Sequence, residues 1–108
     1  MATSKYFLEF ILDMLSEVEG ITFRMMMGEY IIYCKGKIAA YVCDNRLLVK
    51  SVPSALRLMP QAEYEAVSEG GKKNMLRVDN VENKAFLKEL FEAMYLELPE
   101  PKQKRRRL

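Results

Sequence analysis

The chain has 108 residues, half of them apolar and 30% charged, which is the composition of a globular domain. That length fits one domain with its own core, and no window approaches the ~18 apolar residues of a membrane-spanning helix. The first residues lack the order of a secretory signal, so we expect a cytoplasmic protein. Histidine is absent, which excludes Ser-His-Asp and Cys-His catalysis and most zinc sites.

Charge is distributed unevenly along the sequence. The net charge is +2, but residues 102–108 hold five cations and no acid, which leaves twelve cations and fifteen acids before them, a net of −3. We therefore predict a folded domain over residues 1–99 and a basic tail over 100–108 that is disordered when free. Two interpretations of the tail are open. It serves solubility alone, or it makes weak, salt-sensitive contacts with nucleic acid through Lys102, Lys104, Arg105, Arg106 and Arg107.

Residues 4–18 are expected to form the first helix. Apolar residues recur there at helical spacing, at Phe7, Ile11, Leu15 and Val18. Thr3 or Ser4 can supply the N-cap oxygen, and Gly20 suits the left-handed residue that often follows a helix.

From residue 21 to residue 50 the apolar period changes to two, which indicates strands. Two-residue turns are predicted at 28–29, 36–37 and 44–45, because Gly, Asp and Asn accept the positive φ of tight hairpins. The predicted strands are therefore 21–27, 30–35, 38–43 and 46–50, joined as an antiparallel meander. The register set by those turns places Ile31 opposite Val42 and leaves both faces of the sheet largely apolar.

The second of these faces is the predicted partner or dimer surface. It carries Tyr30, Ile32, Tyr41 and Leu48, and exposed apolar patches of that kind mark interaction sites. A different outcome is that residues 60–74, a long and weakly patterned connection, cover this face.

The remaining elements are a short helix from Pro53, a fifth strand over 75–78, and a last helix capped by Asp79 or Asn80. The last helix has an apolar stripe from Phe86 to Leu98. The sequence thus predicts an α+β fold: a two-layer sandwich with an antiparallel sheet of about five strands and helices on one face.

Three further features have both a structural and a functional interpretation. Met25, Met26 and Met27 are either flexible core packing or an adaptable partner surface, and core packing is favoured. Cys34 and Cys43 are too far apart in the predicted register for a disulfide, so we expect two small buried hydrophobic residues. Glu29, Asp44 and Asp79 suit turns and caps, so no catalytic residue, cofactor or metal ion is predicted.

Residues 21–33, together with Gly36-Lys37, residues 44–50 and the last helix, resemble the N-terminal domain of TfoX/Sxy-type proteins. The resemblance covers about residues 4–98, and its markers are Arg24, Met26, Gly28, Tyr33, Gly36 and Lys50. It implies a two-layer α+β fold and no catalytic residues. Members of that family regulate competence genes, acting with the cyclic-AMP receptor protein, and carry a helical second domain where this sequence has its basic tail.

We therefore expect a non-enzymatic binding module that acts through protein–protein contacts, with transcription or competence as the regulated process. We expect no association with membranes. A homodimer is one form of this hypothesis. The alternative is a nucleic-acid accessory protein that uses the basic tail.

Overall fold

The computed structural model describes residues 3–68 and 70–100. In these residues the chain forms three helices and six strands, and their order is α1 (Lys5–Met14), β1 (Ile21–Met26), β2 (Glu29–Cys34), β3 (Lys37–Cys43), β4 (Arg46–Lys50), α2 (Pro53–Leu58), β5 (Tyr64–Glu65), β6 (Met75–Arg77) and α3 (Lys84–Tyr95). The expected α+β fold is confirmed.

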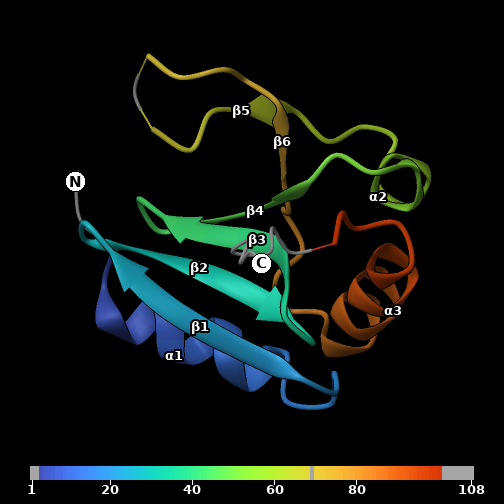
Figure 1. Cartoon of the computed structure of the whole chain (residues 1–108), viewed down its shortest axis with the longest axis horizontal. Helices are drawn as coiled ribbons and strands as arrows, with labels where there is room; N and C mark the ends of the chain where they lie inside the picture. The colour runs from blue at the N-terminus through green and yellow to red at the C-terminus, as the bar shows by residue number, and fades with distance from the viewer. Residues whose placement is uncertain (1–2, 69, 101–108) are drawn as a thin grey trace, which may run out of the picture.

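The strands form one antiparallel sheet with the order β1-β2-β3-β4-β6-β5. Figure 1 shows β1 at one margin of this sheet and the segment around β5 at the other. The prediction of about five strands missed β5, which has only two residues and no alternating pattern of its own.

Three two-residue turns connect the first four strands, and every turn residue has positive φ. The first two turns begin one residue earlier than predicted, and the pairs are Met27-Gly28, Lys35-Gly36 and Asp44-Asn45. The prediction placed glycine at the first position of the first two turns, but glycine occupies the second position. Both positions require positive φ in this turn type.

A bulge in β3 changes the predicted register. Ile32 lies opposite Ala40 while Tyr33 lies opposite Ile38, so β3 has one extra residue at Ala39. Because side chains alternate between faces, a shift of one residue moves a strand's side chains to the other face. With the shifted turn and this bulge, Val42 lies opposite Tyr30, so the predicted pair with Ile31 is wrong. On its other side Val42 lies opposite Leu47.

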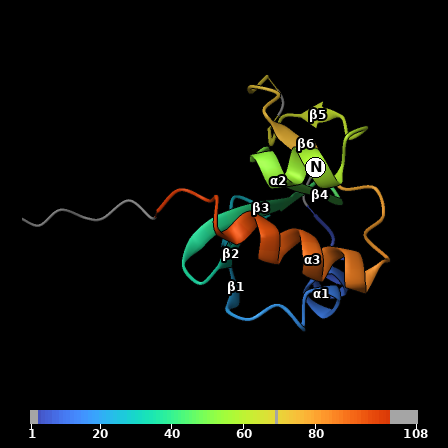
Figure 2. The same cartoon turned by 90° about the vertical axis from the view of Figure 1, so that its right-hand side faces the viewer.

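One face of the sheet packs against the helices, and we call it the helix face. Its strands contribute Ile32, Val42, Leu47, Val49 and Leu76 to the main core, where Ile11 of α1, Ala55 of α2 and Phe91 of α3 meet them. Figure 2 shows α1 and α3 on the same side of the sheet. The prediction of helices on one face is confirmed.

The opposite face, which we call the outer face, has a second and smaller core. Cys43, Leu48 and Met75 are buried there, and Tyr41 and Val67 pack against them. Val67 belongs to the connection between β5 and β6, so this connection folds over the β4 side of the outer face.

Both long helices are shorter than the sequence suggested. Ser4 caps α1, accepting a hydrogen bond from Tyr6 N at 3.1 Å, but α1 ends at Met14 and turns follow it. Gly20 has φ +83° at the entry to β1, where a Cβ would lie 2.5 Å from Lys35 Cγ. Asn83, not Asp79 or Asn80, caps α3, with its side chain accepting from Phe86 N at 3.0 Å.

Candidate interaction site

The first strand exposes large apolar side chains along an open edge of the sheet. Phe23 is 44% exposed, Met25 67%, Met26 50% and Met27, in the following turn, 95%. We call these four side chains, with the backbone of Ile21–Met26, the β1 edge. Phe23 and Met25 lie on the helix face and Met26 on the outer face, so apolar side chains are exposed on both sides of this strand. Exposed apolar surface of this kind is typical of interaction sites.

The backbone of β1 has hydrogen-bonding groups directed away from the sheet. Lys35 N donates to Gly20 O at 2.8 Å, so Gly20 and Lys35 form a hydrogen-bonded pair. Such pairs alternate along an antiparallel ladder, so Thr22, Arg24 and Met26 also bond to β2. Ile21, Phe23 and Met25 therefore direct their N–H and C=O groups outward, where β1 has no neighbouring strand in the described sheet.

Met27 occupies a backbone position that does not favour methionine. Its φ is +54°, in the left-handed region that Asn, Asp and Gly tolerate best. The side chain is almost fully exposed, so packing does not compensate for this conformation. Residues that break local preference without a structural gain occur at functional sites.

An open groove of about 510 Å³ adjoins the start of β1. Leu12 and Leu15 line it from α1 and the turn after it, and Ile21 and Phe23 line it from β1. The Phe23 ring also packs edge-on against Tyr30, with centroids 6.0 Å apart. The β1 edge thus combines free backbone groups, exposed apolar side chains and a neighbouring hollow.

The structure does not bring the predicted partner surface together. Tyr30 and Ile32 lie on the helix face, and Ile32 is fully buried in the main core. Tyr41 and Leu48 lie on the outer face, where Leu48 is fully buried. The prediction that these four residues share one exposed face is wrong, because the turns and the β3 bulge shift the register and the β5–β6 connection covers Leu48.

The residues that carry the family resemblance are dispersed over the sheet. Arg24 and Met26 are exposed on β1, Tyr33 is half-buried on β2, and Lys50 ends β4. Gly28 and Gly36 have φ of +84° and +88°, so their turns account for them. No group of three or more His, Cys, Asp or Glu side chains that could hold a metal ion occurs among residues 3–68 and 70–100.

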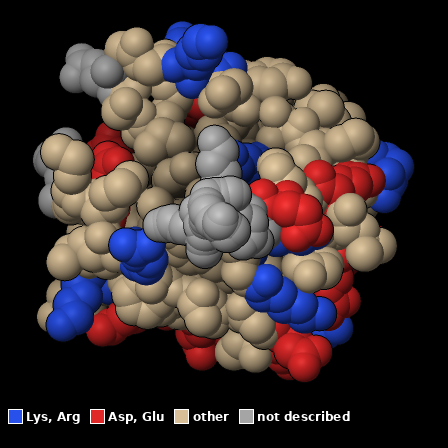
Figure 3. Space-filling view, viewed as in Figure 1, with Lys and Arg blue, Asp and Glu red and all other residues tan. Residues whose placement is uncertain are grey.

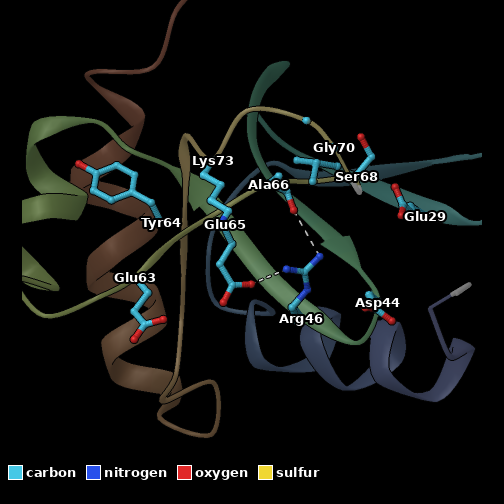
Figure 4. A pocket seen from close by; sticks show the side chains of 12 residues that line it. Glu29, Asp44, Arg46, Glu63, Tyr64, Glu65, Ala66, Ser68, Gly70 and Lys73 are labelled. Atoms are coloured by element: carbon cyan, nitrogen blue, oxygen red, sulfur yellow. Dashed lines mark hydrogen bonds and ion pairs between the residues drawn. The ribbon is translucent and has the colours of Figure 1, made fainter.

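A network of ion pairs holds the β5–β6 connection on the outer face, and Figure 4 shows the contacts that Arg46 makes in it. The Glu65 carboxylate pairs with both Arg46 and Arg77, and Arg77 Nε also pairs with Asp79 at 3.0 Å. Arg46 Nη2 donates to Ala66 O at 3.4 Å. This network borders a polar hollow of about 790 Å³. Because Arg46, Glu65 and Arg77 bind one another, we assign the network a structural role.

The two cysteines are buried and free, as the sequence predicted. Cys34 belongs to the main core and Cys43 to the outer-face core. Burial raises the pKa of both thiols. The neighbouring cation, Lys35 for Cys34 and Arg46 for Cys43, lowers the pKa by a smaller amount. Protonated thiols are poor nucleophiles, so this environment does not favour catalysis.

Charged side chains of both signs are interspersed on the face shown in Figure 3, and most of the surface between them is uncharged. The five cations predicted to contact nucleic acid lie in the tail, outside the described residues. No described helix is long and apolar enough to cross a membrane.

Comparison with known proteins gives one relative of similar length. An uncharacterised 12.7 kDa protein in the 5′ region of trpE in Spirochaeta aurantia is 28% identical over 102 residues, covering 94% of this chain and 89% of the relative. No protein-family model and no solved structure matches the chain.

Proposed function

We propose that this chain is a non-enzymatic, cytoplasmic binding module and that it engages proteins through the β1 edge. The observation that carries the proposal is the exposure of Phe23, Met25 and Met26 beside outward backbone groups. An incoming strand would form main-chain hydrogen bonds with β1, while methionines adapt to varied apolar side chains. Regulation of transcription or competence, which the TfoX/Sxy resemblance implies, is the process we propose for it.

The opposite edge of the sheet supports this choice of surface. Strand β5 has two residues, and its Glu65 is engaged in the ion-pair network. Short and charged edge strands resist pairing with other chains. Strand β1 has six residues and no proline, and its single charge, Arg24, is the one feature of the kind that usually protects an edge.

Site-specific photo-crosslinking in cells tests the proposal. A benzoylphenylalanine at position 23 is expected to form crosslinks to protein partners. Tyr64 is the matched control, because it is an aromatic residue with 49% exposure on the opposite edge, compared with 44% for Phe23. The same products at both positions, or none at position 23, would contradict the proposal.

A second candidate function, contact with nucleic acid through the tail, is favoured by the five cations in residues 102–108. Each phosphate that they neutralise releases counterions, so affinity should fall steeply with salt. Titration of duplex and single-stranded DNA at two salt concentrations, with and without residues 102–108, tests it. Equal affinity of the two chains would contradict this function.

A further inference from the structure

We infer that a second copy of this chain binds the β1 edge, β1 against β1 in antiparallel orientation. This inference rests on the proposed protein-binding function and names one partner for it. A two-fold axis perpendicular to the sheet would join the two sheets into one and keep both helix layers on the same side. Each chain would contribute the same strand, as an isologous interface requires.

The outward backbone groups select one register. Hydrogen-bonded pairs must join residues whose groups point outward on both strands, which are Ile21, Phe23 and Met25. Centring the axis on Phe23 pairs Phe23 with its own copy and Ile21 with Met25 of the other copy, twice by symmetry. Shifting the centre by one residue in either direction loses one of these three pairs.

The only charge on β1 supports the same register. With Phe23 at the centre, Arg24 lies opposite Thr22 of the other copy, and no like charges face each other. With Arg24 at the centre, two guanidinium groups would lie directly opposite, which destabilises a strand pair. The register centred on Phe23 therefore gives the most hydrogen bonds without placing the two arginines opposite each other.

The groove beside β1 can accommodate the partner's side chain. In this register Met25 of one copy lies opposite Ile21 of the other, on the helix face. Ile21 and Phe23 line the groove, together with Leu12 and Leu15. The 67% exposed Met25 would thus lose contact with water against four apolar side chains, and flexible methionine suits an open hollow of this kind.

Sedimentation equilibrium of the full chain, with variants at exposed positions of β1, tests the inference. We expect the average mass of the wild type to rise with concentration from 12.6 kDa toward twice that value. Thr22→Arg places like charges opposite Arg24 at two symmetric positions and should raise the dimer Kd roughly fivefold. Thr22→Glu should lower the Kd, and adding Arg24→Glu to Thr22→Arg should restore dimerisation.

Phe23→Pro provides a test through the backbone. It removes the central outward N–H while leaving the ladder to β2, since proline is tolerated where an edge N–H faces solvent. Loss of the dimer is expected, with circular dichroism confirming the fold. A monomer at millimolar concentration, a dimer that survives Phe23→Pro, or equal effects of Thr22→Arg and Thr22→Glu would overturn the inference. If such a monomer still captures other proteins through position 23, the proposed function remains and only the homodimer fails.

Discussion

Met27 combines an unfavourable backbone conformation with an almost fully exposed apolar side chain. Asparagine tolerates positive φ and is favoured at the first position of this turn type. Met27→Asn should therefore stabilise the fold by about 0.5 to 1 kcal/mol and raise Tm by a few degrees. Thermal unfolding measures this gain.

The same substitution should weaken binding at the β1 edge, because it removes apolar surface. Asp44→Asn, at the first position of a turn with the same conformation away from β1, is the matched control and should leave binding unchanged. Weaker stability in Met27→Asn, or unchanged crosslinking at position 23, would contradict a functional reason for methionine here.

Glu97 links the start of α2 to the end of α3. Its carboxylate accepts hydrogen bonds from Ser54 N at 2.7 Å and Ser54 Oγ at 2.8 Å, which lower the pKa of Glu97. Val52, the N-cap residue of α2, has no side-chain oxygen to cap the helix, so Glu97 supplies the anion that a helix N-terminus favours.

A lowered pKa in the folded state has a definite effect on stability. The stabilisation is complete above the pKa of about 4.3 that glutamate has when unfolded, and it is lost as the pH falls through the lower folded value. Glu97→Gln should thus be less stable than the wild type at pH 7, and the difference should shrink below pH 4. Urea unfolding at both pH values measures this, and a constant difference would contradict the role.

Among the elements, the β5–β6 connection decides how much of the outer face is free. Leu48 is fully buried against Met75 beneath this connection. Leu48→Ala should cost about 2 to 5 kcal/mol in the free energy of unfolding, because it leaves a cavity.

Met26, also on the outer face but half exposed, is the control for this prediction. Met26→Ala should cost less than about 1 kcal/mol, since little area is lost from the interior. Chemical denaturation measures both variants. Equal costs would show that the connection does not shield Leu48 from water.

The sequence predicted most elements but not their faces. Helical periodicity located α1 and α3, and the alternation of apolar residues located the first four strands. The faces were wrong because one extra residue, Ala39, reverses the alternation in β3, and nothing in an apolar run marks a bulge. Strand β5 was missed because two residues, Tyr64 and Glu65, cannot show a period.

For the whole molecule, the location of the site depended on sheet order. Met25 and Met26 are exposed because β1 lies at the margin of the sheet. Strand β1 keeps this position because β6 and β5 extend the sheet on the other side, beyond β4. These are contacts between residues distant in sequence. The sequence favoured core packing for Met25, Met26 and Met27, and their exposure shows that this prediction is wrong. Phe23 and the outward backbone groups could be identified only from the strand pairing.

The central claim is that the β1 edge binds another strand, and amide hydrogen exchange measured by NMR tests it most directly. In dilute protein the amides of Ile21, Phe23 and Met25 should exchange rapidly, while those of Thr22, Arg24 and Met26 are protected by β2. Raising the protein concentration should protect the first three amides and leave the others unchanged. Rapid exchange of Ile21, Phe23 and Met25 at every concentration, and in the presence of any captured partner, would contradict the claim.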